Sequence, residues 1–354
     1  MKVIYLPIEP LEERYTAQWY KWFPEEMKAM EIEYIVIDGE PLTKEVEVGT
    51  FLDINSTLHY KATQLQRIAA MFHRKEIYNG DVFLVADIEF WGIESIRYLA
   101  DLNGINVKLC GFCHAGSYTR EDFMGKCSSY AQWFERAWFN VFDKIFVGSQ
   151  YHKIQMIQKR QVNPCKVIVT GNPYRVKDLR LKFSNVEKIN RVILTNRPDD
   201  EKRPEVSLMV MAALKRHHSD WQFIVTTSRK TWGKSALREF VLFFADQGIV
   251  VLREGLSKDE YLQLLAESRV MISNSIEENF GYCVLEAMAV NTIPIVPNAY
   301  SYPELISDPR CLFNSLSEQL LLVKRAIEKP FDVWGYAMKY DDSLKAILKE
   351  TITA

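Results

Sequence analysis

The chain has 354 residues, of which 48% are apolar and 25% charged, a globular composition with room for two domains of ordinary size. Its 44 Lys and Arg against 46 Asp and Glu give a net charge of −2, which excludes a global basic field but leaves a local basic face open. No apolar run approaches the roughly 20 residues of a membrane span. No charged-then-apolar leader opens the sequence, so we expect a cytoplasmic protein without integral membrane association.

In the first half, short apolar strands alternate with helices. Strands are predicted at 3–6, 34–37, 82–85, 107–112 and 144–147. Helices are predicted at 13–30 with an interruption or kink at Pro24, at 56–75 with Ser56 as N-cap, at 93–102, at 129–139, and up to 159 with Ser149 as N-cap. Continuous apolar strands between helices indicate a parallel sheet covered on both faces.

A second α/β series follows a break. Thr170-Gly171-Asn172-Pro173 and the lysine-rich stretch 175–188 predict an interdomain linker. Beyond it, strands are predicted at 192–194, 223–226, 249–252, 270–272 and 293–296, and helices at 205–217, 234–246, 257–267, 282–290 and 333–350. The predicted domains are 1–172 and 173–330, with a C-terminal helical segment 331–354. In such an architecture, ligands bind at the carboxyl ends of the strands.

The six cysteines do not predict a metal or haem site. Cys110-Gly-Phe-Cys113-His114 matches the c-type haem pattern. Haem attachment, however, needs export, and this segment continues a buried strand. A zinc site using Cys127 lacks a second Cys or His pair. We therefore expect no metal and no resident cofactor.

The run from Glu278 to Met288 is the most informative stretch. It follows a short apolar strand, contains a glycine in a loop, and enters a helix near Tyr282. Strand, loop and helix in this order present backbone N–H groups and a positive helix end to an anion. Carboxylates there repel phosphate, so Glu278 and Glu286 more plausibly accept hydrogen bonds from hydroxyls on either side of it. A diphosphate flanked by sugar hydroxyls is a nucleotide sugar.

These residues, Glu278-Asn279-Phe280-Gly281-x-x-x-Leu285-Glu286-Ala287-Met288, resemble the E-x7-E signature of retaining glycosyltransferases of family 4. The resemblance implies the GT-B fold, two Rossmann-like α/β domains facing across a cleft, with the C-terminal helix crossing back to the first domain. It implies that Glu278 holds donor-sugar hydroxyls and Glu286 the ribose. The intervening loop would line the donor site through Asn279, Phe280, Gly281 and Tyr282. The family usually has glycine where this chain has Asn279, which leaves that backbone less free.

A basic pair follows the first strand of the second series. Arg197-Pro-Asp-Asp-Glu-Lys202 has the Arg-x4-Lys spacing of the pair that neutralises the leaving nucleoside diphosphate in this family. The resemblance gives that role to Arg197 and Lys202. Arg203 stands where the family commonly has glycine and can replace or supplement Lys202. Two cations and helix N–H groups can stabilise the leaving group without a metal. We therefore predict metal-independent transfer with retention and require no protein base.

Two further positions carry weaker matches. His114 ends the predicted strand 107–112, where the family often has a histidine near the donor sugar. The resemblance makes it a sugar contact, and a histidine hydrogen-bonded in a loop is the alternative. Arg253 stands where the family's base-binding backbone lies, so the resemblance implies that Arg253 or its neighbours line the nucleobase pocket. UDP is the favoured nucleotide of the donor.

The acceptor side departs from the family pattern. Aromatic residues at 15–23 and 90–91, and the loop 117–126 with Tyr118, Arg120 and Lys126, can receive a flat or anionic acceptor. The alternative is that most of these aromatics belong to the core. The N-terminal segment resembles phage-encoded glycosyltransferases that modify hydroxymethylcytosine in DNA. That resemblance implies double-stranded DNA as acceptor and the host cytoplasm as location.

The sequence leaves two other functions open and disfavours a third. A cytoplasmic transferase acting on a carbohydrate or lipid-linked glycan remains open. So does a non-catalytic sugar- or nucleic-acid-binding protein of the same fold. A nicotinamide dehydrogenase is disfavoured because no G-x-G-x-x-G follows the first strand.

Overall fold

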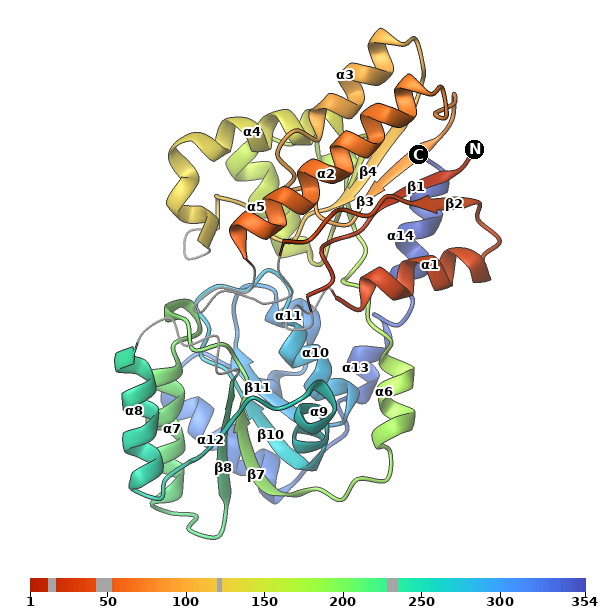
Figure 1. Ribbon diagram of the computed structural model, residues 1–354. Helices are drawn as coiled ribbons and strands as arrows, with labels where there is room; N and C mark the ends of the chain where they lie inside the picture. Colours follow the sequence, from red (N-terminus) through yellow and green to blue (C-terminus); the bar gives the residue numbers. More distant parts are fainter. Residues whose placement is uncertain (12–16, 43–52, 120–122, 228–234) are drawn as a thin grey trace. The chain divides into compact units, whose positions relative to one another are not determined.

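The computed structural model describes all residues except 12–16, 43–52, 120–122 and 228–234 (Figure 1). Its contacts divide the chain into two compact units. Unit 1 takes the described residues up to Pro173 together with Asp342–Ala354, and unit 2 takes Tyr174–Asp341. Each unit has one six-stranded sheet in which every pairing is parallel.

The sheet of unit 1 has the order β2-β1-β3-β4-β5-β6. Its strands are β1 Val3–Leu6, β2 Tyr34–Val36, β3 Val82–Val85, β4 Lys108–Phe112, β5 Lys144–Val147 and β6 Val167–Val169. Every residue of β1 and β3 is buried, as expected for strands covered on both faces. The order reverses between β1 and β3, so the loops that follow these strands diverge there.

Helices cover both faces of this sheet (Figure 1). Those after β2 lie side by side on one face: α2 Ile54–His73, α3 Glu94–Leu102, α4 Ser128–Val141 and α5 Gln150–Arg160. On the other face α1, Trp19–Ala29, packs against the C-terminal helix α14, Ser343–Ile352. Pro24 lies inside α1 and does not end it.

The predicted N-cap of α2 is wrong. Asp53 caps this helix, and its Oδ1 accepts a hydrogen bond from the Ser56 N–H at 2.8 Å. Ser56 lies in the first turn, and its hydroxyl donates to Glu9 Oε1 at 2.6 Å. Asp and Ser are comparable capping residues, so the two were not separable by residue type. The predicted cap of α5 is confirmed, because the Ser149 side chain accepts from the His152 N–H.

The sheet of unit 2 has the order β12-β11-β10-β7-β8-β9. Its strands are β7 Ile189–Leu194, β8 Gln222–Thr227, β9 Val251–Glu254, β10 Ser268–Ile272, β11 Ile293–Pro297 and β12 Leu312–Phe313. Successive strands run outward from β7 in one direction and from β10 in the other. The order therefore reverses between β7 and β10, which is where doubly wound folds place their ligands.

Within its described residues, eight helices of this unit flank the sheet or connect its strands. They are α6 Val176–Phe183, α7 Pro204–Lys215, α8 Ser235–Asp246, α9 Lys258–Glu267, α10 Tyr282–Ala289, α11 Tyr302–Leu305, α12 Leu316–Glu328 and α13 Trp334–Met338. Among the residues placed by the structure, no helix combines the length and apolarity needed to span a bilayer.

Two predictions about helices are corrected. The stretch 175–188, predicted as a linker, contains α6, which buries Val176 and Phe183 and packs against α10 and α13. The predicted C-terminal helix 333–350 is two helices, α13 in unit 2 and α14 in unit 1, separated by a turn at 339–342. Helix α12 and strands β6 and β12 were not predicted.

Unit 1 buries a polar cluster beside β4. The Tyr118 hydroxyl lies 2.6 Å from His152 Nε2 and 3.5 Å from Cys113 Sγ. Burial, with a smaller effect from His114, lowers the pKa of His152 to about 3. His152 is therefore neutral in the folded chain, and its Nε2 is hydrogen-bonded to the Tyr118 hydroxyl.

This burial predicts a pH dependence of stability. In the unfolded chain His152 has a pKa near 6.5. Between about pH 6.5 and pH 3, the unfolded state therefore binds a proton at His152 that the folded state does not bind. Stability should fall as the pH drops through this window, by up to about 1.4 kcal/mol per pH unit. His152→Gln should flatten the slope of unfolding free energy between pH 7 and 5, measured by urea titration. The matched change at exposed His73 should keep it. An unchanged slope in His152→Gln would contradict the assignment.

Candidate functional site

The site of unit 2 is built on the neighbouring strands β7 and β10. They pair in parallel with Leu194 opposite Ile272, so their carboxyl ends coincide. The loop after β7 carries Arg197 to Arg203, and the loop after β10 carries Glu278 to Gly281. The two loops are tied together because the Glu201 carbonyl accepts from the Ile276 N–H at 2.8 Å and the Ser275 hydroxyl at 3.2 Å. Lys202 and Glu278, which are 76 positions apart in the sequence, are thereby brought into contact.

Lys202 and Glu278 are in direct contact. The Lys202 ammonium lies 3.0 Å from Glu278 Oε2 and donates to the Glu277 carbonyl at 3.2 Å. Both side chains are mostly buried, with 12% and 19% of their surface exposed. Burial alone would lower the pKa of Lys202, but the Glu278 and Glu201 carboxylates outweigh it and raise that pKa. Lys202 is thus a fixed cation beside the carboxylate expected to hold sugar hydroxyls.

Arg197 is also paired. Its Nη1 lies 3.0 Å from Asp199 Oδ2, and its Nη2 lies 3.5 Å from Glu201 Oε1. Burial raises the pKa of Glu201, partly opposed by Lys202. The Arg197 side chain keeps 37% of its surface exposed. The guanidinium is therefore accessible, but two carboxylates of its own loop already approach it.

The loop before α10 needs its glycine. Gly281 has φ +100°, and an added Cβ would lie 3.3 Å from Leu305 Cδ2. It is the N-cap of α10 and has no side chain to cap the helix, so an anion can fill that role. Phe280 is buried against Tyr282 and Tyr340. Among the described residues with positive φ outside glycine, Asn279 does not occur, so replacing the family's glycine there imposes no backbone strain.

Glu286 lies inside α10 with only 3% of its surface exposed. Its Oε1 accepts from the Tyr174 hydroxyl at 2.9 Å and contacts the Lys258 ammonium, while Oε2 accepts from the Tyr261 hydroxyl at 2.9 Å. Burial and the Glu286 charge raise the pKa of both tyrosines well above its usual value, so both remain donors. The carboxylate is held rigidly, and the half-exposed Lys258 is its most displaceable partner.

Sequence reasoning missed these three partners of Glu286. Tyr174 directly follows the Pro173 break, and Lys258 and Tyr261 lie in the first turn of α9. No local motif links them to Glu286, since Tyr174 is 112 positions away. The only signal was their position after predicted strand ends or breaks, which many polar residues share.

The other two predicted donor residues of this unit lie apart from these contacts. Arg203 is the N-cap of α7 in the left-handed region at φ +47°, the conformation that favours the family's glycine. Its guanidinium approaches Glu205 at 3.7 Å. Arg253 lies in β9 opposite Thr226 of β8, one residue before that strand ends.

His114 belongs to unit 1 and follows β4. Its Nε2 lies 2.9 Å from the Ala86 carbonyl, and its ring packs 5.0 Å from Trp19 and 4.8 Å from Phe112. The side chain is anchored to the loop after β3 rather than extended into solvent. The carbonyl contact fixes the ring in place, as the alternative interpretation of a histidine hydrogen-bonded in a loop expects, and the sugar contact stays a prediction.

Sequence reasoning also missed charged residues at the strand reversal of unit 1. Glu9, after β1, is 1% exposed and accepts from the Ser56 and Thr57 hydroxyls. Asp87, after β3, lies 2.9 Å from the Lys61 ammonium, and both side chains are largely buried. Ligands bind at such reversals, so these groups are candidates for the acceptor side.

Three of the predicted acceptor aromatics lie in the core. Trp19, Phe23 and Phe90 are each 1% exposed, which supports the alternative interpretation for them. Trp91 is only partly buried and lies 6.2 Å from the exposed Tyr130. Tyr15 and Arg120 lie outside the described residues. The Tyr118 hydroxyl is hydrogen-bonded to His152, and Lys126 lies in the short 3-10 helix Phe123–Cys127 before α4.

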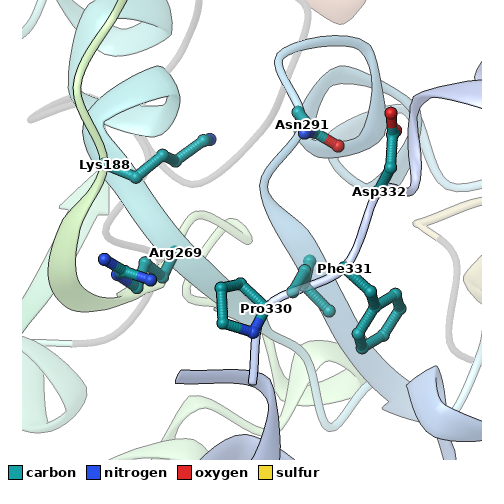
Figure 2. A pocket seen from close by; sticks show the side chains of 7 residues that line it. Lys188, Arg269, Asn291, Pro330, Phe331 and Asp332 are labelled. Atoms are coloured by element: carbon teal, nitrogen blue, oxygen red, sulfur yellow. The ribbon is translucent and has the colours of Figure 1, made fainter. Parts of the chain in front are cut away.

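A cavity of about 330 Å³ lies at the amino ends of the unit 2 strands, opposite to the ends that carry the loops after β7 and β10 (Figure 2). It is lined by residues near the amino ends of strands: Lys188, Arg269, Asn291, Ile293, Pro330, Phe331 and Asp332. Lys188 donates to the Ser268 and Val290 carbonyls and the Thr292 hydroxyl, so its ammonium ties strands and helices together. The cavity is remote from the carboxyl ends where the paired charges gather.

A protein-family model matches this unit. Residues 176–315 match the model of "Glycosyl transferases group 1". A tRNA-queuosine alpha-mannosyltransferase of Drosophila melanogaster is 30% identical over 120 residues, which are 34% of this chain and 31% of that protein. The chain thus spans about a third of the curated relative that it matches.

Solved structures are similar over the whole chain. The sucrose-phosphate synthase of Thermosynechococcus elongatus has a TM-score of 0.69 at 13% identity, covering 100% of this chain and 97% of that one. Anabaena Alr3699/HepE in complex with UDP and glucose has a TM-score of 0.60 at 14% identity, covering 100% of both chains. The pneumococcal O-GlcNAc transferase GtfA, in complex with UDP and GlcNAc, has a TM-score of 0.58 at 15% identity, covering 90% and 64%. This likeness confirms the predicted GT-B fold, and the match to the family model covers residues 176–315 of the chain.

Proposed function

We propose that the chain transfers a sugar from a nucleoside-diphosphate sugar, with UDP as the favoured nucleotide, to a hydroxyl acceptor with retention and without a metal. The observation that carries the proposal is the contact of Lys202 with Glu278 at the strand reversal of unit 2, eight residues before the buried Glu286. Cations, a helix N-terminus and two hydroxyl acceptors are what a diphosphate between two sugars requires.

The proposed chemistry divides charge between these groups. The bond between the sugar C1 and the diphosphate oxygen breaks, and the electron pair leaves with the diphosphate. Arg197, Lys202 and the N–H groups of α10 stabilise the developing negative charge. The acceptor oxygen forms the new bond to C1 on the same face, and its proton passes to a diphosphate oxygen. Glu278 accepts hydrogen bonds from sugar hydroxyls, and Glu286 from the ribose.

A neutral glutamine side chain at position 286 would accept fewer hydrogen bonds than the Glu286 carboxylate. Its carboxylate already receives two tyrosine hydroxyls, and a carboxylate offers about four acceptor positions. A ribose hydroxyl can take the remaining position, and displacing Lys258 frees another. The nucleobase would lie near the end of β9, where Arg253 is placed.

For the acceptor, we propose a hydroxyl on a modified base of nucleic acid, hydroxymethylcytosine in DNA being the first candidate. The name of the Drosophila relative describes a mannosyltransferase of a modified nucleoside in tRNA, which supports this class of acceptor. Unit 1 would hold the acceptor near Asp87, Lys61 and His114. The cytoplasm, or a host cytoplasm for a phage-encoded chain, is the proposed location. A carbohydrate or lipid-linked acceptor and a non-catalytic binding protein are the alternatives.

Product analysis tests the proposed reaction. UDP- and GDP-sugars are incubated with hydroxymethylated DNA, tRNA and glycans in the presence of EDTA. The masses of the products are then measured by mass spectrometry. We expect one pentose or hexose to be added to nucleic acid, with the donor's anomeric configuration by NMR. Transfer only to glycans would favour the carbohydrate alternative, and nucleotide binding without transfer or donor hydrolysis would favour the binding protein. Transfer that occurs without EDTA but is lost when EDTA is present would contradict the proposed metal independence.

Nucleotide affinity tests the donor residues separately. Arg197→Ala and Glu286→Ala each remove a charged hydrogen-bonding partner of the nucleotide, so each should weaken UDP binding about tenfold or more. Isothermal calorimetry with UDP and GDP measures this. The same change at Glu328, which is 50% exposed in α12, is the control. Wild-type affinity of both variants for both nucleotides would remove the donor site from this place.

Turnover tests Lys202 against the leaving group. Lys202→Met should lower kcat by about 10²–10³-fold, the effect typical of losing one stabilising donor in an electrostatic site. Lys324→Met, at a position of α12 where the side chain is 48% exposed, should leave kcat unchanged. A rise in KM with kcat unchanged would show instead that Lys202 contributes equally to ground-state and transition-state binding.

A further inference from the structure

Arg197, one of the two cations proposed for the diphosphate, is occupied by a carboxylate of its own loop. Asp199 Oδ2 lies 3.0 Å from Arg197 Nη1. We infer that Asp199 competes with the donor diphosphate for Arg197 and so weakens nucleotide binding and speeds nucleotide release. This inference rests on the proposed function, because it concerns the ligand of that site.

The position of Asp199 suits a competitor better than a structural partner. It is the residue before the short 3-10 turn Asp200–Lys202, yet its side chain makes no capping hydrogen bond to that turn. Its backbone carbonyl, not its carboxylate, holds the turn by accepting from the Lys202 N–H at 2.9 Å. The Asp199 side chain is 22% exposed and the Arg197 side chain 37%. Solvent therefore reaches the pair, and the carboxylate can turn away without unfolding the loop.

Glu201 is the second carboxylate at Arg197 but a poorer competitor. Its Oε1 lies farther away, 3.5 Å from Nη2, and its side chain is 15% exposed. Its backbone carbonyl anchors the loop after β10 through Ile276 and Ser275. Asp199 is therefore the carboxylate through which the competition acts.

Charge and geometry explain how the competition works. A guanidinium binds a carboxylate and a phosphate through the same planar fork of N–H donors. A diphosphate arriving at Arg197 must displace Asp199 or lie beside it, and like charges at that distance repel. The cost applies to bound donor and to the nucleoside diphosphate product alike. Removing the Asp199 charge would therefore strengthen the binding of both the donor and the nucleoside diphosphate product. The product would then be released more slowly.

Calorimetry with UDP tests the inference on the full chain. Asp199→Asn keeps the size and the acceptor oxygen but removes the charge, so we expect UDP to bind about fivefold tighter, the upper range for a partly exposed pair. Asp200→Asn removes the same charge from the next, exposed residue and should change affinity by less than about twofold. In an Arg197→Ala background, Asp199→Asn should also have less than about a twofold effect, because the competition has lost its target.

The outcomes separate this inference from the proposed function. If neither UDP nor GDP binds the wild-type chain, the proposed function fails. If wild type binds UDP but Asp199→Asn binds equally or more weakly, Asp199 positions Arg197 and the inference is overturned. An equal gain with Arg197 present or absent would assign the effect to the general field of the loop and overturn it as well. Thermal unfolding of each variant within a few degrees of wild type shows that the comparison is between folded proteins.

Discussion

The parallel pairing of β7 with β10 is the constraint on which the rest of unit 2 depends. These strands are separated by two other strands in sequence but are neighbours in the sheet, with Leu194 opposite Ile272. Because both end at the same level, a basic loop and an acidic loop emerge together. A shift of register by one residue would turn side chains to the other face of the sheet. It would also part Lys202 from Glu278. The apolar strands thus determine the electrostatics of a site in which they take no direct part.

The charges of this site balance one another before any ligand is considered. Lys202 faces Glu278, Arg197 faces Asp199 and Glu201, and Lys258 faces Glu286. A mostly buried charge without a partner would be costly, so pairing allows cations and carboxylates to share a small volume. The same pairing means that a ligand exchanges contacts rather than adding them. Its net affinity depends on how much better its own hydroxyls and phosphates fit than the side chains they displace.

The sequence was sufficient for the strands and for the motif but not for the contacts between distant segments. Apolar runs such as Val270 to Ile272 have no solvent-exposed face, so the parallel sheet was predictable. The start of α10 at Tyr282 was predictable because Gly281 marks it. Helix α6 was not, because six of its eight residues are left unburied and a lysine-rich surface helix has the composition of a linker. Tyr174 and Tyr261 were beyond prediction, since their role exists only where three separated segments converge on Glu286.

The connection between α13 and α14 affects how the protein can be divided. The chain passes from unit 1 to unit 2 after Pro173 and returns after Asp341, so unit 1 is discontinuous in sequence. A polypeptide ending at residue 341 would lack α14, and the face of α1 that packs on it would be uncovered. Unit 2, in contrast, is one continuous stretch from Tyr174 to Asp341 in the described chain. Unit 2 can therefore be expressed as one uninterrupted segment. To express unit 1, its last thirteen residues must be connected to Pro173 through a designed linker.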